Sequence, residues 1–246
     1  MDIAPDDRGE NVRREICLTL EQMGIRPESS HHEEGPGQNE IDFRYSDALT
    51  AADNVLTFQN VVKTVARRNG LMADFSPKPI MDAAGNGFHI NMSVNKDSSD
   101  IYMSMIAGIL DKICDMTLFL NPTEESYLRF GQRKAPKYVS WSGENRSQLI
   151  RIPAAVGEFK RCELRSPDPM TNPYLAYTLM IYAALDGISN KMVPPEAADF
   201  NLFSADPETL KQFRSLPETI TEARKLAGES AFIKAHVPKE ILDIYL

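Results

Sequence analysis

Charged side chains occupy every second position over residues 161–165, where the sequence reads RCELR. Successive side chains of an extended strand point to opposite faces, so Arg161, Glu163 and Arg165 share one face. Arg146 and Arg151 lie a short distance upstream. A carboxylate between guanidinium groups suits a site that holds a metal ion together with a phosphate-bearing ligand. The same pattern is also typical of a solvated sheet face with salt bridges.

Two further segments place oxygen and nitrogen donors on strands or loops. The segment HHEEGPGQNEID carries Glu33 and Glu40, and GFHINMS carries His89. Together with Glu163, these side chains offer carboxylates and an imidazole, a set that suits Mg²⁺ or Mn²⁺ better than zinc. A single histidine on a strand face is more often a surface or structural residue, so composition alone leaves both interpretations open.

The composition indicates a soluble globular protein. The chain has 246 residues and a formal net charge of −8, and this length suits one large domain or two small ones. The acidic balance argues against general nucleic-acid affinity, so the basic segment from Arg129 to Arg165 indicates a small anionic ligand. Three widely spaced cysteines are typical of reduced thiols in the cytoplasm. We expect neither a signal peptide nor a membrane span.

Hydrophobic periodicity predicts an α+β fold. Helical spacing indicates helices at about 9–23, 47–70, 101–120 and 172–187, with one short helix near 216–226. Alternation indicates strands within 28–45, at 72–75 and at 87–94. This order favours a curved antiparallel sheet with helices packed on one face and a polar opposite face.

Several long motifs resemble, in order, those of prokaryotic-type glutamine synthetases. They read APDDRGENVRR, HHEEGPGQNEIDF, ADNVLTFQNVVKTVARRNGLMADFSPKPI, GNGFHINMS, NPTEESYLRF, NRSQLIRIP, CELRSPDPMTNPYLAY and LDGI. The resemblance is to the C-terminal catalytic part of these enzymes, with 1–190 as a partial catalytic domain and 191–246 as its helical and loop tail. It implies ATP-dependent joining of glutamate and ammonia through γ-glutamyl phosphate, and a homo-oligomer in full-length relatives.

The resemblance also implies roles for individual residues. Glu33 and Glu40 resemble the ligands of one Mg²⁺ or Mn²⁺ ion, and His89 and Glu163 those of a second. The residues implied to bind ATP are Glu28, Asn91, Ser93, Arg146 and Arg151. Those implied to bind glutamate or the transferred phosphoryl group are Gly85, Arg129, Arg146 and Arg165, and the three arginines are the implied catalytic residues. In this chemistry, metals and arginines compensate the negative charge of the transferred group.

Several positions depart from the family pattern. Lys134, in GQRKAP, stands where related enzymes carry a glutamate that attracts ammonium. Replacing the negative charge of that glutamate by a positive one would raise the barrier for ammonium by about 2 kcal/mol at high effective dielectric, and by more in a dry site, unless the side chain points to solvent. Asn91 replaces a frequent histidine, Ala84 a frequent asparagine, and Glu158 lies near the position of a nucleotide-binding lysine. Phe203 occupies the place of a tyrosine that some relatives adenylylate, so we do not expect that switch here.

Two functional classes stay open. The first is an enzyme, either a glutamate–ammonia ligase or a γ-glutamyl ligase that uses another amine. The second is a truncated, non-catalytic or partner-dependent family member. In full-length relatives, a β-grasp domain and a strand with two further glutamate ligands precede the matched part. We therefore expect each metal site to be incomplete in this chain and a sheet edge to be unpaired.

Overall fold

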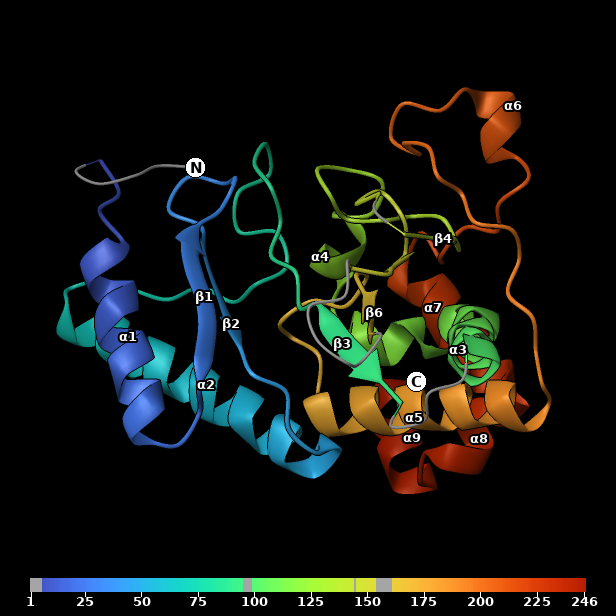
Figure 1. Ribbon diagram of the computed structural model, residues 1–246, viewed down its shortest axis with the longest axis horizontal. Coiled ribbons are helices and arrows are strands. Elements are labelled where there is room, and N and C mark those ends of the chain that lie inside the picture. The colour runs from blue at the N-terminus through green and yellow to red at the C-terminus, as the bar shows by residue number, and fades with distance from the viewer. Residues whose placement is uncertain (1–5, 95–98, 144, 154–160) are drawn as a thin grey trace. The chain divides into compact units, whose positions relative to one another are not determined.

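The computed structural model describes residues 6–94, 99–143, 145–153 and 161–246 (Figure 1). Its chain divides into two compact units. Unit 1 comprises Met1–Phe75 and Pro79–Asn86, and unit 2 comprises Ser76–Lys78 and Gly87–Leu246. Each unit has its own hydrophobic core and is described by itself.

Unit 1 is a β-hairpin covered by two helices. Asp47 is the N-cap of α2, since its Oδ1 accepts a hydrogen bond from the N–H of Thr50 at 3.1 Å. Ile16 and Leu20 of α1 pack with Val65 of α2 in the core. The elements are α1 (Glu10–Gln22), β1 (Pro27–His32), β2 (Asn39–Phe43) and α2 (Ala48–Arg68).

The hairpin has one apolar and one polar face. Ile41 and Phe43 of β2 pack against the core of unit 1, and strand geometry places Glu40 and Asp42 on the opposite face. The two strands pair antiparallel, with His31 directly opposite Glu40. Figure 1 shows them side by side, with α1 next to β1. The polar face therefore carries side chains from both strands.

Two long helices form the centre of unit 2, namely α3 (Ser99–Leu120) and α5 (Pro173–Ser189). They cross closely at Gly108 and Gly187. A Cβ on Gly108 would lie 2.1 Å from the carbonyl oxygen of Ala183, and one on Gly187 would lie 2.2 Å from that of Ser104. Only glycine allows the two backbones to approach to this distance. Asn172 caps α5 by accepting from the N–H of Tyr174 at 3.0 Å.

A four-stranded sheet packs on this helical core. Its strand order is β3-β6-β5-β4, and the β4–β5 pair is parallel whereas the other two pairs are antiparallel. Ile90, Ile150 and Leu164 point into the core with α3 and α5. The opposite face carries the charged side chains of the candidate site. The strands are β3 (Ile90–Ser93), β4 (Trp141–Ser142), β5 (Ile150–Arg151) and β6 (Arg161–Leu164).

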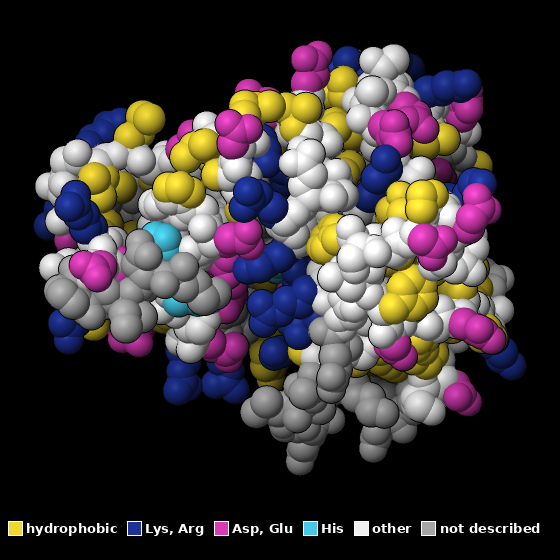
Figure 2. Space-filling model, turned by 90° about the horizontal axis from the view of Figure 1, so that it is seen from above, with side chains coloured by type: hydrophobic (Ala, Val, Ile, Leu, Met, Phe, Trp, Pro, Cys, Tyr) yellow, Lys and Arg dark blue, Asp and Glu magenta, His cyan; other side chains and the backbone are white. Residues whose placement is uncertain are grey.

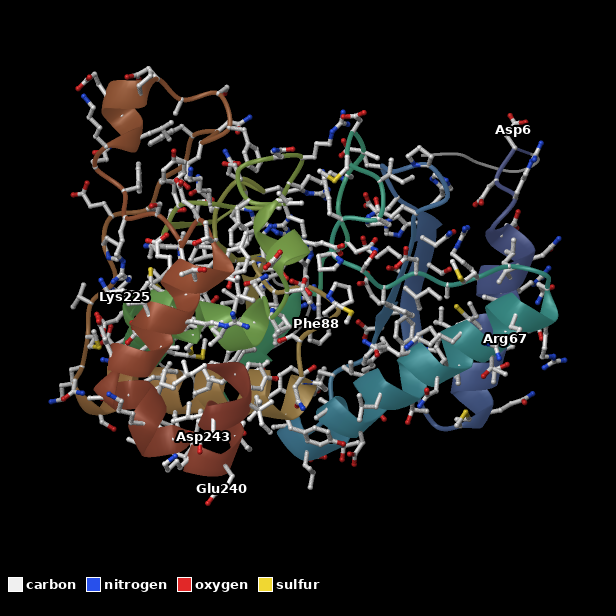
Figure 3. The ribbon with its side chains drawn as sticks, turned by 180° about the vertical axis from the view of Figure 1, so that it is seen from behind. Asp6, Arg67, Phe88, Lys225, Glu240 and Asp243 are labelled. Atoms are coloured by element: carbon white, nitrogen blue, oxygen red, sulfur yellow. The ribbon has the colours of Figure 1, made fainter. Side chains whose placement is uncertain are left out.

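The remaining helices are short. Ser230 joins two of them, because it ends α7 and its Oγ accepts from the N–H of Ile233 at the start of α8 at 3.2 Å. Glu240 and Asp243 lie exposed on α9 (Figure 3). These helices are α4 (Glu124–Tyr127), α6 (Pro207–Leu210), α7 (Ile220–Glu229), α8 (Ala231–His236) and α9 (Lys239–Tyr245).

The predicted α+β class is confirmed, and three details differ. The sheet was predicted to be antiparallel, but its β4–β5 pair is parallel. The predicted strand at 72–75 is wrong: this segment forms no ladder, and Phe75 instead packs edge-on against Phe58 of α2. The segment after residue 190 contains four helices rather than one. In the described parts of the chain, every helix is too short or too polar to cross a membrane. The assignment of 1–190 and 191–246 to a catalytic domain and its tail stays a prediction.

Candidate functional site

Unit 1 gathers three potential metal ligands on the polar face of its hairpin. Nε2 of His31 lies 3.3 Å from Oε1 of Glu33 and 3.8 Å from Oε2 of Glu40. One ligand atom from each residue lies within 4.8 Å of the others. Glu33 and Glu40 were predicted from the sequence, whereas His31 was missed. Its position two residues before Glu33, on the same face of an extended segment, was the available signal.

The turn between β1 and β2 fixes this arrangement. The N–H of Glu33 donates to the carbonyl of Gln38 at 2.8 Å, and the N–H of Gln38 donates to that of Gly35 at 3.0 Å. Oε2 of Glu33 accepts from the N–H of Glu34 at 2.9 Å, so Oε1 is the oxygen beside His31. Two carboxylates and an imidazole suit a divalent cation such as Mn²⁺. The donor set therefore fits the predicted metal.

Gly85 and Glu28 also belong to unit 1. The carbonyl of Gly85 and Oδ1 of Asn86 each accept from Nε2 of Gln38 at 3.0 Å, which ties residue 85 to the hairpin turn. Glu28 is exposed on β1, at the irregularity in the strand register between Pro27 and Ser29. Both stay predicted ligand-binding positions.

In unit 2, three cationic or potentially cationic side chains converge on one carboxylate. Arg151 donates from Nε to Oε2 of Glu163 at 2.6 Å, and Arg165 donates from Nη1 to Oε1 at 3.0 Å. Nδ1 of His89 lies 3.1 Å from the same Oε1. The side chains of Glu163 and Arg165 are only 8% and 3% exposed. This part of the sheet face is thus enclosed rather than solvated.

The strand register explains the convergence. Glu163 on β6 pairs with Asn91 on β3 and with Arg151 on β5, and Arg151 pairs with Ser142 on β4. Paired residues point to the same side of a sheet. One polar row therefore crosses all four strands, with the carboxylate in its middle.

The charges in this network shift one another's proton affinities. Burial raises the pKa of Glu163, but His89, Arg165 and Arg151 outweigh burial and hold that pKa well below its usual value. Glu163 is thus ionised in the native chain. The 3.1 Å between the His89 and Glu163 atoms is close to the separation, about 3 Å, of neighbouring ligands around a six-coordinate ion with 2.1 Å bonds.

Arg129 is enclosed. Its Nη1 donates to the carbonyl of Ser166 at 3.2 Å and lies 3.6 Å from Oδ2 of Asp168. Burial lowers the pKa of Arg129 to about 10, and the charge of Asp168 opposes that decrease. Asp168, which is fully buried, was not predicted to be near the site.

The other predicted ligand residues of unit 2 lie on exposed positions. Asn91 and Ser93 are exposed on the polar face of β3, and Arg146 is exposed in the loop before β5. Basic and acidic side chains are interspersed on the molecular face in Figure 2. The exposed polar groups would be accessible to a ligand.

The whole chain, residues 1–246, matches the family described as "Glutamine synthetase, catalytic domain". The chain belongs to this family. The glutamine synthetases of Clostridium saccharobutylicum and Methanosarcina mazei are 42% and 43% identical over 261 residues. These matches take in 100% of this chain but 59% and 58% of those relatives. The chain thus spans less than two thirds of their length.

Two solved structures resemble the fold of this chain. The structure described as "GmaS/ADP complex-Conformation 1" has a TM-score of 0.86 at 28% identity, over 96% of this chain and 59% of that one. "Apo GmaS without ligand" has a TM-score of 0.83 at 30% identity, over 94% and 56%. The fold of this glutamine synthetase family member therefore resembles that of both structures.

The positions that depart from the family pattern have different surroundings. Arg133 and Lys134 both have positive φ, at 40° and 73°, in a tight turn where the N–H of Ala135 donates to the carbonyl of Gln132 at 2.9 Å. Lys134 is half-buried, Ala84 is buried and Phe203 is 39% exposed. Glu158 lies outside the described residues.

Proposed function

We propose that the chain takes part in ATP-dependent ligation of ammonia to the γ-carboxyl group of glutamate. The observation that carries this proposal is the convergence of His89, Arg151 and Arg165 on the enclosed Glu163. Membership of the glutamine synthetase family supports the reaction type. The substrates are then glutamate, ammonia and ATP, and not nucleic acid.

The reaction would proceed in two transfers. First, a γ-carboxylate oxygen of glutamate attacks the γ-phosphorus of ATP, and ADP leaves with the electrons of the broken P–O bond. Ammonia then attacks the carbonyl carbon of γ-glutamyl phosphate, inorganic phosphate leaves, and the amide nitrogen loses a proton. Negative charge gathers on the transferred group, so the guanidinium groups of Arg151 and Arg165 would stabilise it electrostatically.

The two donor sets would bind divalent cations. His31, Glu33 and Glu40 would hold Mg²⁺ or Mn²⁺ in unit 1, and His89 and Glu163 would hold a second ion in unit 2. Such ions neutralise phosphate charge when bound.

Ligand contacts are proposed for the remaining predicted residues. Glu28, Asn91, Ser93, Arg146 and Arg151 would bind ATP. Gly85, Arg129, Arg146 and Arg165 would bind glutamate or the phosphoryl group, with the three arginines as the catalytic residues. A cytoplasmic location and assembly into a homo-oligomer are likewise proposals by family.

A product assay tests this function. The folded 246-residue chain is incubated with ATP, Mg²⁺ or Mn²⁺, glutamate and ammonium, and glutamine is measured by mass. We expect product from the native chain and a loss of about a hundredfold or more in Glu163→Gln, as for other electrostatic groups of an active site. Glu218→Gln is the control, because Glu218 is exposed and pairs with Lys137. A folded native chain that makes no product would contradict the proposal and favour the non-catalytic or partner-dependent class.

A second candidate is ligation of a different amine. It is favoured by the half-buried Lys134, whose positive charge would oppose ammonium. The same assay distinguishes the two, because a set of neutral and anionic amines can replace ammonium. A γ-glutamyl product with another amine, at a higher kcat/KM than with ammonium, would support this alternative.

A further inference from the structure

Arg129 and Asp168 form a buried ion pair in unit 2. Their side chains are 2% and 0% exposed, and Nη1 lies 3.6 Å from Oδ2. The direct hydrogen bonds of Arg129 go to the carbonyl oxygens of Ser166 and Pro167, at 3.2 and 3.4 Å. An enclosed guanidinium requires a nearby negative charge, because an unpaired buried charge is strongly unfavourable. Asp168 supplies that charge.

Asp168 is itself held rigidly against the end of α3. Its Oδ1 accepts from the N–H of Met170 at 2.9 Å, and its Oδ2 accepts from Nδ2 of Asn121 at 3.1 Å. Its own N–H donates to the carbonyl of Leu120 at 3.2 Å. Nδ2 of Asn121 also donates to the carbonyl of Ser166 at 2.8 Å. Both carboxylate oxygens therefore have fixed partners, and the carboxylate has a defined position.

Nη2 of Arg129 lies near Gly87 and His89, and His89 in turn contacts Glu163. A Cβ placed on Gly87 would lie 3.7 Å from Nη2 of Arg129 and 3.0 Å from Nε2 of His89. The next residue, Phe88 (labelled in Figure 3), donates its N–H to the carbonyl of Pro167 at 2.9 Å. The loop that accepts from Arg129 is thus tied directly to the segment that carries His89.

We infer that Asp168, supported by Asn121, is a positioning residue that holds the Arg129 guanidinium beside Gly87 and His89. There the charge of Arg129 acts on the anionic substrate, a carboxylate or phosphoryl group. The inference rests on the proposed function for the identity of this substrate. Because Arg129 is enclosed, its charge acts through protein rather than water, where an electrostatic interaction is stronger.

The position of Arg129 can be measured without turnover. In the full chain labelled with ¹⁵N-arginine, the Nε–Hε signal of Arg129 is assigned by its loss in Arg129→Lys. This Nε is buried without a hydrogen-bond partner among the described residues, so enclosure alone protects its proton from solvent. We expect exchange to accelerate by at least about tenfold in Asp168→Asn and by a smaller factor in Asn121→Ala.

A matched control separates this effect from general destabilisation. Asp115 also lies in unit 2 and accepts a hydrogen bond from Oγ of Ser230 at 2.6 Å. Asp115→Asn should leave the exchange of the Arg129 proton unchanged. The kinetic measurement uses the same variants: in Asp168→Asn the KM for glutamate should rise by about tenfold while that for ATP stays within about twofold.

Unchanged exchange in a folded Asp168→Asn chain would overturn the inference. If Asp168→Asn does not fold, unchanged exchange in Asn121→Ala has the same meaning. Equal increases in both KM values would also overturn it, because they would indicate a purely structural role. Absence of product from the native chain would contradict the proposed function, whereas the exchange comparison would still support or overturn the positioning role.

Discussion

Nε of Arg151 and Oε2 of Glu163 lie 2.6 Å apart on neighbouring strands of one sheet. Arg165 donates to the other oxygen of the same carboxylate. Glu163 thus links two guanidinium groups that would otherwise repel each other at short range. Its charge matters for the stability of the native chain as well as for the proposed chemistry.

Replacing Glu163 should have a pH-dependent effect on stability. The native pKa of Glu163 lies well below its usual value of 4.5, so the unfolded chain binds this proton more tightly than the native chain. The stabilisation from Glu163 is therefore fully present above about pH 4.5 and is lost as the pH falls through the lower native pKa. The free energy of unfolding of Glu163→Gln, measured with urea, should be lower by about 3–5 kcal/mol at pH 7. The difference from the native chain should shrink progressively below pH 4.5. A difference independent of pH would show that the Glu163 charge is not stabilising.

Replacing His31 should weaken binding of Mn²⁺ in unit 1. Nε2 of His31 lies 3.3 Å from Oε1 of Glu33 and 3.8 Å from Oε2 of Glu40, so the three side chains could bind one ion. Removal of the imidazole would leave only the two carboxylates as ligands. Electron paramagnetic resonance titration of free Mn²⁺ should show that His31→Asn binds the ion at least about tenfold more weakly. About tenfold is the smallest loss of metal affinity that is typical when a residue supporting a metal ligand is replaced. His236→Asn is the control, because His236 stacks on Tyr182 in unit 2. Equal affinity in the two variants would exclude His31 as a ligand.

Gly108→Ala should destabilise unit 2. The new methyl group would lie 2.1 Å from a backbone carbonyl of α5, so the two central helices must separate. Overpacking of this kind costs about 1–3 kcal/mol or more, and thermal unfolding should detect it. Gly228→Ala provides a matched comparison within α7, where the nearest atoms are 3.6 Å away. That variant should be neutral or stabilised by up to about 1 kcal/mol.

Lys134→Glu should raise turnover with ammonium. Reversal of the charge removes repulsion of about 2 kcal/mol, which corresponds to roughly a 30-fold change in rate. The control is Arg133→Glu, since Arg133 lies in the same turn with positive φ but is exposed. The measurement is kcat/KM for ammonium at saturating ATP and glutamate. Equal effects of the two variants would indicate a general surface-charge effect rather than a role for Lys134 in amine choice.

The sequence predicted the long elements of the fold because their signals are local. Asp47 and Asn172 stand at the predicted starts of two helices, and the structure shows that both side chains accept N-cap hydrogen bonds there. The helices missed after residue 190 include three of four to seven residues, too short to show a clear periodicity. The segment 72–75 was predicted to be a strand, but a strand also requires a neighbouring strand, which local sequence does not specify.

The candidate site was predictable to a similar extent. Alternation placed Glu163 and Arg165 on one face, and the structure joins them by a hydrogen bond. The partnership of Arg129 with Asp168 was not predictable, because 39 positions in sequence separate them and nothing local links the end of α4 to that loop. Tertiary packing buries Asp168 of the SPDP segment next to Arg129, where its carboxylate balances the charge of the guanidinium group. Such relationships arise only from tertiary packing.

The three proposed ligand residues of unit 1 all come from a single hairpin, within ten consecutive positions from His31 to Glu40. Their assembly therefore needs only local chain closure, which is fast and costs little entropy. A cation held by both strands would also act as a cross-link between them, adding about 2.7 kcal/mol to hairpin stability at a hundredfold excess over Kd. One short stretch of chain would thus supply all three proposed ligands, and a bound ion would in turn stabilise the pairing of the two strands that present them.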